Sequence, residues 1–423
     1  MINQRKIALS ALIDVEKNDA YSNLVLQKAF LKYNVDNVDR PFISALFYGV
    51  LDRKITLDFV ISKFIKKPIS KIMPITLSAL RLSIFQMMFM DKIPQSAAVN
   101  ESVNLVKNSK ERYNAAFVNA VLRNFLRQGI SLPDDNSVES LSIRYSCPEW
   151  IIKSFFNDYG EDTAISLLSH FLTTPDITVR VNSLKVSDEQ FISLLNEEGV
   201  DVKPLSIPHA FSFKSGIDIK GLNSYKSGLF YAQDIQSQIA VSKLNISSFE
   251  RILDMCAAPG GKTFFAAIAT GNNGKITSGD FYEKRVELIR QGAKRLGLNN
   301  IDCRVCDSRV FDKSLGKYDA VICDVPCSGL GVIRRKPEIK YKTNIDLNEL
   351  KVIQSDILEN ASRYLKPEGR VLYSTCTVRR DENEGIVSAF LDKHSNFELK
   401  YEHTFLPNTD NTDGFYCAVI KSR

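Results

Sequence analysis

Apolar residues recur three and four positions apart through the first third of the chain, the spacing that gives a helix one buried face. Helices are expected to begin at Arg40, after Asp39, and at Gln95, after Pro94. The apolar positions that carry the pattern are Ala8, Leu12, Val15, Ile43, Leu46, Phe47, Val50, Leu77, Leu80, Ile84, Met87, Met88, Val118, Val121, Leu122 and Phe125. Residues 1–130 are therefore predicted to form an all-helical bundle.

The pattern changes after Gly129. Between Gly129 and Pro148 the chain is polar, acidic and contains proline, which indicates a linker. The elements expected after it are helices over 149–171 and 188–199, a strand over 177–181 and an alternating, strand-like stretch over 200–213. Together they predict a small α+β unit over residues 145–238.

From about residue 239 the pattern alternates between strands and helices. Helical stretches separate the strands RILDMC, KITSGD, DCRVCD, YDAVICD and GRVLYSTC, as in a mostly parallel sheet with helices on both faces. Each of these strands ends in Asp or Cys, and ligands of such sheets bind at the carboxyl ends of the strands. Residues 239–423 are thus expected to form an α/β domain with a ligand site at those ends.

Composition narrows the class of protein. With 423 residues, 44% of them hydrophobic and 25% charged, the chain fits a multidomain globular protein and not a disordered chain or a coiled coil. Its longest apolar run, Ile75 to Met90, is too short for a membrane span and contains Arg81, and no export signal is expected at the N-terminus. The eight cysteines are therefore expected to be free thiols in a reducing, cytoplasmic compartment.

Charge is unevenly distributed along the chain. Residues 1–130 hold 19 Lys and Arg residues against 10 Asp and Glu residues, a net +9, whereas the remaining residues carry a net −3. Such asymmetry is typical of a nucleic-acid-binding part, because phosphate neutralisation supplies most sequence-independent affinity; a solvated basic surface without a partner fits the charge equally well. The basic side chains expected at helix ends or on polar faces are Lys63, Lys66, Lys67, Lys71, Arg123 and Arg127.

A Pro-Gly-Gly turn follows the first strand of the α/β part. The residues CAAPGGKT, Cys256 to Thr263, lead into an apolar helix, so a ligand can approach the backbone and the helix N-terminus closely. One candidate ligand is a nucleotide in a P-loop. Gly261, Lys262 and Thr263 match the end of that motif and Asp324 could be its acidic partner, although Cys256 stands where the first glycine belongs.

The other candidate ligand is suggested by acids at successive strand ends. Asp280 ends the second strand about twenty residues past the turn, the spacing at which a carboxylate reaches a ribose hydroxyl, and Asp307 follows the third strand, where it can accept from an adenine amino group. With Asp324 after the fourth strand, the series fits the adenosine of S-adenosylmethionine, although each acid alone fits a helix N-cap equally well. A P-loop enzyme needs neither Asp280 nor Asp307.

Two cysteines complete the candidate site. Cys327 follows the fourth strand and Cys376 ends the fifth, so both thiols are expected over one crevice, although a buried structural role fits either cysteine taken alone. A thiolate that adds to carbon 6 of cytosine makes carbon 5 able to attack a sulfonium methyl, after which a base removes the carbon 5 proton and the thiol leaves. Lys262 or the basic run Arg334, Arg335 and Lys336 could favour the thiolate, and Asp324 could stabilise the ring at N3.

The motifs CAAPGGKT, DVPCSG, RRKPEIK and YSTCTV together resemble the signature set of the NOL1/NOP2/Sun family of RNA 5-methylcytosine methyltransferases. The resemblance covers the whole chain, including PQSAAVNESVNLVK in the first third and RVN in the middle unit. It implies a multidomain chain: an N-terminal all-α NusB-like RNA-binding bundle at 1–130, a small α+β RNA-binding unit at 145–238 and a C-terminal α/β Rossmann-like methyltransferase domain at 239–423. It also implies methylation of carbon 5 of a cytosine in 16S ribosomal RNA through a covalent cysteine–cytosine adduct.

Site residues are carried over by matching position. Cys376 corresponds to the nucleophile of the family and Cys327 to the cysteine that helps to release the product. The S-adenosylmethionine contacts correspond to Cys256, Ala257, Ala258, Pro259, Gly260, Gly261, Lys262, Asp280, Asp307 and Asp324. Val325 and Thr377 stand where the family usually has Ala and Ser, and neither change removes a polar group.

The expected cofactor is S-adenosylmethionine and the expected partner is small-subunit ribosomal RNA, for a monomer with no membrane and no metal ion. Zinc is not expected, because Cys303 and Cys306 have no second pair and no suitably spaced histidine. Two alternatives stay open: a P-loop-like nucleotide hydrolase and a non-catalytic RNA-binding or antitermination factor. Retention of radiolabelled ATP or S-adenosylmethionine separates the two enzymes, and the factor leaves both strand-end cysteines unexplained.

Overall fold

The structure, a computed structural model, describes residues 3–18, 20–342, 346–410 and 412–423. Its contacts divide the chain into a helical unit, residues 1–173 with 333–343, and a second unit, residues 174–332 with 344–423. In the described ranges no helix is both long and apolar enough to cross a membrane.

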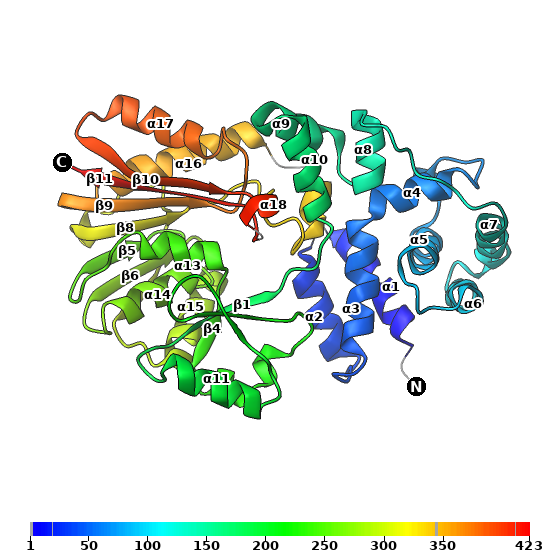
Figure 1. The fold of residues 1–423 in the computed structure, drawn as a ribbon, viewed down its shortest axis with the longest axis horizontal. Helices are drawn as coiled ribbons and strands as arrows, with labels where there is room; N and C mark the ends of the chain where they lie inside the picture. The colour runs from blue at the N-terminus through cyan, green and yellow to red at the C-terminus, as the bar shows by residue number, and fades with distance from the viewer. Residues whose placement is uncertain (1–2, 19, 343–345, 411) are drawn as a thin grey trace. The chain divides into compact units, whose positions relative to one another are not determined.

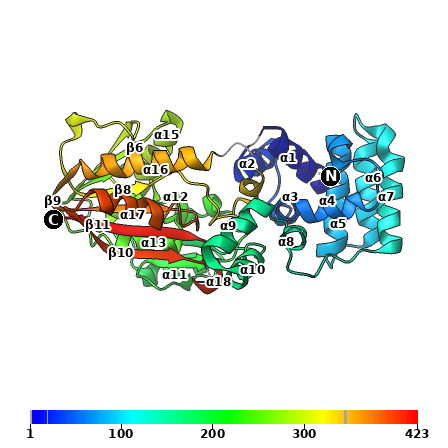
Figure 2. The ribbon, with the colours of Figure 1, turned by 90° about the horizontal axis from the view of Figure 1, so that it is seen from above.

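The helical unit confirms the all-α prediction for the first third of the chain. Helix α7 buries Val118, Val121, Leu122 and Phe125, the stripe that the sequence predicts, and Figure 2 shows α5, α6 and α7 beside one another. Helices also begin at Arg40 and Gln95 as expected. The helices of this unit are α1 (Gln4–Asn18), α2 (Ser22–Lys32), α3 (Arg40–Asp52), α4 (Lys54–Ser62), α5 (Pro74–Phe89), α6 (Gln95–Lys107), α7 (Ala115–Gln128), α8 (Val138–Tyr145), α9 (Glu149–Tyr159) and α10 (Glu161–His170).

One local prediction in this unit is wrong, and another is refined. Part of the expected linker after Gly129 is helix α8, where Ser137 caps the N-terminus by accepting from the backbone N–H of Ser140, and Leu141 is fully buried. The helical stretch expected over 149–171 is present as two helices, α9 and α10, with Gly160 at a φ of 77° between them.

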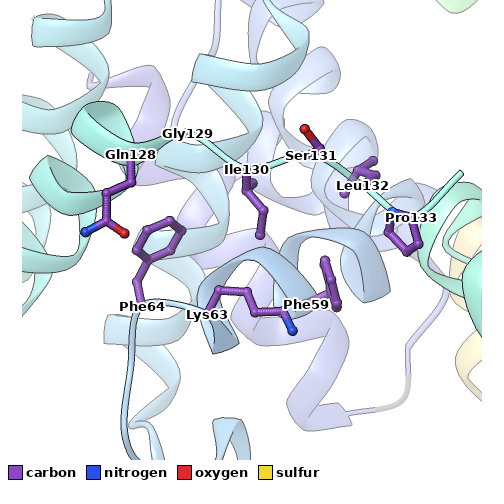
Figure 3. A pocket seen from close by; sticks show the side chains of 9 residues that line it. All are labelled: Phe59, Lys63, Phe64, Gln128, Gly129, Ile130, Ser131, Leu132 and Pro133. Atoms are coloured by element: carbon purple, nitrogen blue, oxygen red, sulfur yellow. The ribbon is translucent and has the colours of Figure 1, made fainter.

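An open hollow of about 480 Å³ lies on the helical unit, where α4 meets the segment that follows α7. Figure 3 shows Phe59 and Phe64 on one side of it and Ile130 and Leu132 on the other, with Lys63 between the two rings. Its lining residues are mainly apolar, with Lys63 the charged group among them.

A segment from late in the chain also belongs to the helical unit. Within residues 333–342, Glu338 Oε1 accepts from the backbone N–H of Ser22 at 3.0 Å, and Lys340 Nζ donates to the backbone oxygen of Asp52 at 2.9 Å. Glu338 and Lys340 are both buried, at 5% and 3% exposure. The chain therefore leaves the second unit after Val332 and rejoins it after this segment.

The second unit contains two sheets. The smaller sheet is antiparallel, in the order β2-β3-β1-β4, and its core packs Phe191 against Phe211 and Phe230. Its elements are β1 (Ile177–Val181), α11 (Asp188–Glu197), β2 (Lys203–Pro204), β3 (Ala210–Phe213), α12 (Asn223–Lys226) and β4 (Phe230–Ala232). A capping box between Ser187 and Gln190 begins α11.

The larger sheet has the order β10-β11-β9-β8-β5-β6-β7. Its five predicted strands are parallel to one another, as expected, and α13, α14 and α15 cover one face while α16 and α17 cover the other (Figure 1). Two strands that the sequence did not predict, β10 and β11, add antiparallel pairs beside β9. The elements are α13 (Ile235–Ser242), β5 (Arg251–Asp254), α14 (Gly261–Ala269), β6 (Lys275–Asp280), α15 (Glu283–Leu296), β7 (Ile301–Val305), β8 (Tyr318–Asp324), α16 (Leu347–Ser362), β9 (Leu365–Thr375), α17 (Glu384–Lys393), β10 (Phe397–Phe405), α18 (Pro407–Asp410) and β11 (Phe415–Ser422).

Candidate active site at the carboxyl ends of the parallel strands

The predicted site residues lie on strands that are neighbours in the sheet. Asp254 at the end of β5 is in register with Ser278 of β6 and Ile322 of β8, and Asp324 at the end of β8 is in register with Ser374 of β9. Because these strands are parallel, their carboxyl ends and the loops that follow them meet at one end of the sheet.

The glycine turn between β5 and α14 is shaped by two close approaches. Gly260 has a φ of 112°, and a Cβ there would lie 2.4 Å from the ring of Phe264. The backbone N–H of Ala258 donates to Asp280 Oδ2 at 3.2 Å, so the turn is tied to the end of β6. The ring of Phe264 thus fills the space that a side chain at Gly260 would need.

The acids of the series have different partners. Asp280 is buried, and besides Ala258 it pairs with Arg285, whose Nη1 lies 3.3 Å from Oδ1. Asp307 pairs with Arg309, whose Nη2 lies 2.7 Å from Oδ2, and this hydrogen bond lowers the pKa of Asp307. Asp280 therefore lies at the turn, whereas Asp307 forms an ion pair with Arg309.

Lys262 pairs with Asp324 at the end of β8. Its Nζ lies 2.7 Å from Asp324 Oδ2, and Ser374 Oγ donates to Asp324 Oδ1 at 2.8 Å. Lys262 Nζ also lies 3.3 Å from Ser237 Oγ. Both oxygens of the Asp324 carboxylate are thus held, and the lysine of the P-loop-like sequence binds a carboxylate of the same unit.

The two predicted cysteines are in contact. Cys327 Sγ lies 3.4 Å from Cys376 Sγ, with Cys327 on the loop after β8 and Cys376 directly after β9. The hydrogen bond between the thiols and the burial of Cys327 hold the pKa of Cys327 well above its usual range. The two thiols therefore share one hydrogen bond, and the pKa of Cys327 depends on the state of Cys376.

The Cys376 loop is packed tightly against the chain that follows Cys327. The backbone N–H of Gly331 donates to the carbonyl oxygen of Cys376 at 3.0 Å, and that of Gly414 donates to Gly331 O at 2.8 Å. A Cβ on Gly331 would lie 2.1 Å from Gly414 O, so only glycine fits at this crossing. The approach of the two loops is thus fixed by backbone as well as by sulfur.

Some polar groups near the turn were missed by the sequence analysis. The side-chain amides of Gln233 and Gln236 are buried and have no hydrogen-bond partner among the described residues, and Gln233 lies 3.5 Å from the Cβ position of Gly261. A buried unpaired amide beside a glycine turn, as at Gln233, fits a polar ligand such as an adenosine or an amino acid group. The surrounding sequence carries no motif that separates these glutamines from surface ones.

Asp254 was also missed, although RILDMC contains it. It is completely buried, it accepts from Thr263 Oγ1 at 2.7 Å, and burial raises its pKa to about 7. The predicted strand RILDMC ends at Cys256 and so places Asp254 inside the strand, whereas β5 ends at Asp254 itself.

The basic run Arg334, Arg335 and Lys336 lies in the helical unit. Arg334 Nη1 is 3.0 Å from His170 Nε2, and Lys336 Nζ lies over the ring of Tyr21. Its expected help in ionising a thiol stays a prediction. No cluster of three or more His, Cys, Asp or Glu residues suited to a metal ion occurs in the described ranges.

Comparison with known proteins places the chain in a family. The NusB family model matches residues 2–127, a ferredoxin-like domain of RsmF/B-like methyltransferases matches 147–220, and the 16S rRNA methyltransferase RsmB/F model matches 241–421. The chain is 35% identical to the probable ribosomal RNA small subunit methyltransferase B of Bacillus subtilis, over 99% of this chain and 98% of that protein. The chain belongs to this family of ribosomal RNA small subunit methyltransferases.

Further relatives of this methyltransferase agree. The probable ribosomal RNA small subunit methyltransferase B of Synechocystis is 30% identical over the full length of both chains. The solved structure of PH0851 superposes with a TM-score of 0.87 at 25% identity, covering 100% of this chain and 99% of that one. NSun6 from Pyrococcus horikoshii with SFG, at 21% identity and a TM-score of 0.61 over 65% of this chain and 98% of that one, shows the same fold.

These matches confirm the family and the fold class expected from the sequence. They favour the methyltransferase over the nucleotide hydrolase and over the non-catalytic factor. The domain boundaries at 1–130, 145–238 and 239–423 remain predictions, as do the roles of the individual site residues.

Proposed function

We propose that this methyltransferase transfers a methyl group from S-adenosylmethionine to carbon 5 of a cytosine in small-subunit ribosomal RNA, through a transient bond between Cys376 and the ring. The observation that carries the proposal is the 3.4 Å contact between the sulfurs of Cys327 and Cys376, at the ends of strands that also carry Asp324 and Ser374. Two thiols in contact suit a reaction in which one is the nucleophile and the other assists the release of the product. Methylation of a ring nitrogen or a ribose hydroxyl needs neither thiol.

Cys376 is the proposed nucleophile. Its thiolate forms a bond to carbon 6, the ring electrons move towards carbon 5, and Asp324, held by Lys262 and Ser374, stabilises the ring at N3. S-adenosylmethionine, when bound, supplies the methyl group that carbon 5 takes. Once Cys376 is bonded to carbon 6, the hydrogen bond to Cys376 and the charge of Cys376 no longer raise the pKa of Cys327. The proton on carbon 5 then passes to the Cys327 thiolate, the proposed base; the carbon 5–carbon 6 double bond re-forms, the bond from sulfur to carbon 6 breaks, and the Cys376 thiolate returns.

The residues that would hold the cofactor surround the glycine turn. The proposed contacts are Cys256, Ala257, Ala258, Pro259, Gly260, Gly261, Lys262, Asp280, Asp307 and Asp324. The unpaired amide of Gln233, beside Gly261, fits a polar ligand here. A relative of the same fold, NSun6, was solved with SFG, an analogue of S-adenosylmethionine, which supports the assignment.

The helical unit is the proposed partner of RNA phosphates. The six basic side chains expected to be available there, Lys63, Lys66, Lys67, Lys71, Arg123 and Arg127, are all exposed. Exposed lysine and arginine side chains neutralise phosphates without reading sequence. This placement supports a role in RNA binding for the net positive charge of the first third of the chain.

Substitution of each cysteine tests the proposal. Cys376→Ala should abolish methylation, whereas Cys327→Ala should let the adduct form and slow its release, so that a protein–RNA complex survives denaturing electrophoresis. The reverse pattern would mean that the two roles are exchanged. Unchanged methylation in both variants would exclude a covalent cysteine mechanism, and bisulfite mapping of ribosomal RNA with and without the protein would identify the modified position.

A further inference from the structure

A buried carboxylate, Glu382, lies between the two cysteine loops. Its side chain has no exposed surface. Oε1 accepts from Ser328 Oγ at 2.6 Å, and Oε2 accepts from the Ser328 backbone N–H at 2.8 Å and from Gln354 Nε2 at 3.0 Å. Since Ser328 directly follows Cys327, both oxygens of Glu382 hold the residue next to that cysteine.

The same segment also holds the residues on either side of Cys376. Ser328 Oγ lies 2.9 Å from Thr377 Oγ1, so the hydroxyl that binds Glu382 also contacts the Cys376 loop. Asn383, the next residue after Glu382, accepts from Thr375 Oγ1 at 2.6 Å and donates to the Thr377 carbonyl oxygen at 3.1 Å. Glu382 and Asn383 therefore connect to both loops through direct hydrogen bonds.

Further contacts fix Glu382 itself. Tyr373, on β9, donates from its hydroxyl to the Glu382 backbone oxygen at 2.7 Å. Gln354, on α16, also donates to the carbonyl oxygen of Pro326, which precedes Cys327, at 3.0 Å. The side-chain hydrogen bonds to the carboxylate thus come from an uncharged hydroxyl and an uncharged amide, while Arg379 Nε is 3.9 Å from Oε1. The donors are mainly neutral, so they do not cancel the negative charge of Glu382. Because the surroundings have a low dielectric constant, this charge acts strongly on ionisable groups nearby.

We propose that Glu382 is a positioning residue that holds the Cys327 loop against the Cys376 loop, and so controls the step in which the adduct is released. The inference rests on the proposed function for its last part, because release is defined only if Cys376 forms an adduct. It assigns to Glu382 an action through Ser328 on Cys327, not a contact with RNA.

The charge of Glu382 supports this assignment. After the hydrogen bond to Cys376, burial and the charge of Cys376, the charge of Glu382 contributes to the raised pKa of Cys327. A neutral isostere at position 382 should therefore allow Cys327 to ionise at lower pH, and should weaken the hydrogen bonds to Ser328. A purely structural carboxylate would affect stability and leave the reactivity of Cys327 unchanged.

The test compares Glu382→Gln with a matched control, Glu384→Gln. Glu384 lies two residues away and accepts from Thr404 Oγ1 at 2.7 Å, so it offers the same substitution away from the cysteines. Alkylation of the full-length protein by iodoacetamide, read by mass spectrometry at each cysteine, measures Cys327 without RNA. In Glu382→Gln the alkylation of Cys327 at mildly alkaline pH should be roughly tenfold faster than in the wild type, with no change in Glu384→Gln.

The second measurement follows the adduct. With RNA and S-adenosylmethionine, Glu382→Gln should shift the pH profile of adduct release to lower pH and reduce its alkaline plateau by roughly tenfold, because the loops are no longer held together. Ser328→Ala removes the hydroxyl that links the two loops, so it should also lower the alkaline plateau of the release rate. This variant tests the proposal if Glu382→Gln does not fold.

The outcomes separate the two proposals. If Cys327 alkylates at the wild-type rate in folded Glu382→Gln, or if Ser328→Ala releases the adduct normally, the inference about Glu382 is overturned. If alkylation changes as expected but no variant, including Cys327→Ala, ever forms an adduct, then the covalent mechanism fails while the effect of Glu382 on Cys327 stands.

Discussion

Asp254 provides a quantitative test of the electrostatics beneath the glycine turn. Its carboxylate is completely buried at the end of β5; Oδ2 accepts from Thr263, and Oδ1 has no hydrogen-bond partner among the described residues. Burial is the main reason that its pKa rises from 3.8 to about 7, with the hydrogen bond from Thr263 opposing it. The substitution Asp254→Asn keeps the shape of the side chain and the acceptor for Thr263, and it removes the titration.

The sign of the effect follows from the raised pKa. Between the unfolded pKa and about 7 the folded state binds the Asp254 proton more tightly than the unfolded state, so the free energy of unfolding falls as pH rises through this range. Each unit of pKa difference corresponds to about 1.4 kcal/mol, and the part of the titration between pH 5 and 8 amounts to about 2 to 3 kcal/mol. As pH rises from 5 to 8, the free energy of unfolding of Asp254→Asn should therefore increase by about 2 to 3 kcal/mol relative to that of the wild type.

Amide hydrogen exchange measures this difference in the right place. Because the chain has two units, a single unfolding midpoint does not isolate β5, whereas exchange in peptides that cover β5 and α14 reports the local free energy of opening. Comparing the variant with the wild type at each pH cancels the intrinsic pH dependence of exchange. A difference between the two proteins that is the same at pH 5 and pH 8 would refute the reasoning.

Three further changes have defined outcomes. Asp324→Asn removes the charge that pairs with Lys262 but keeps a hydrogen-bond acceptor for Ser374. The rate of methyl transfer in single-turnover assays should fall by about 100-fold or more with the fold unchanged. A normal rate would show that Asp324 has no part in the mechanism. Gly260→Ala forces a side chain into a backbone with a φ of 112°, which should destabilise the turn by about 1–3 kcal/mol and weaken S-adenosylmethionine binding by calorimetry; tight binding would show that the turn adapts. Leu141→Ala should lower the free energy of unfolding of the helical unit, measured from the fluorescence of Trp150, by about 2–5 kcal/mol, whereas a loss below about 1 kcal/mol would mean that α8 packs loosely.

Much of the fold follows from local pattern in the sequence. The stripe of α7 and the strands β5, β6, β8 and β9 are encoded within short windows, so periodicity alone locates them. The strand β10 was missed although FELKYEHTF alternates apolar and charged residues as a half-exposed strand does, because only strands that end in Asp or Cys were predicted in this part of the chain. Helix α8 was missed because SLPDDNSVESLS contains a single fully buried leucine, Leu141, in an otherwise polar stretch.

The candidate site divides in the same way. Asp280 and Asp324 end their strands, Cys376 directly follows β9, and Cys327 lies on the loop after β8. Because the carboxyl ends of parallel strands meet at one end of the sheet, the proximity of these residues could be predicted. The position of Glu382 in the site could not be predicted, because it depends on hydrogen bonds to Ser328, which lies 54 residues earlier in the chain. A carboxylate in a run such as DENEG looks like a solvated surface acid until its burial is known.

Because residues 333–342 belong to the helical unit, neither unit is a single continuous piece of the chain. A fragment that began at residue 174 would carry Glu338 and Lys340 without Ser22 and Asp52, and two ionic side chains that are now sheltered would have to find water or new counterparts. A fragment that ended at residue 173 would in turn expose the surface those side chains cover. Recombination that replaced only residues 1–173 would have to preserve the partners of Glu338 and Lys340 for both units to fold. This requirement favours inheritance of the two units together.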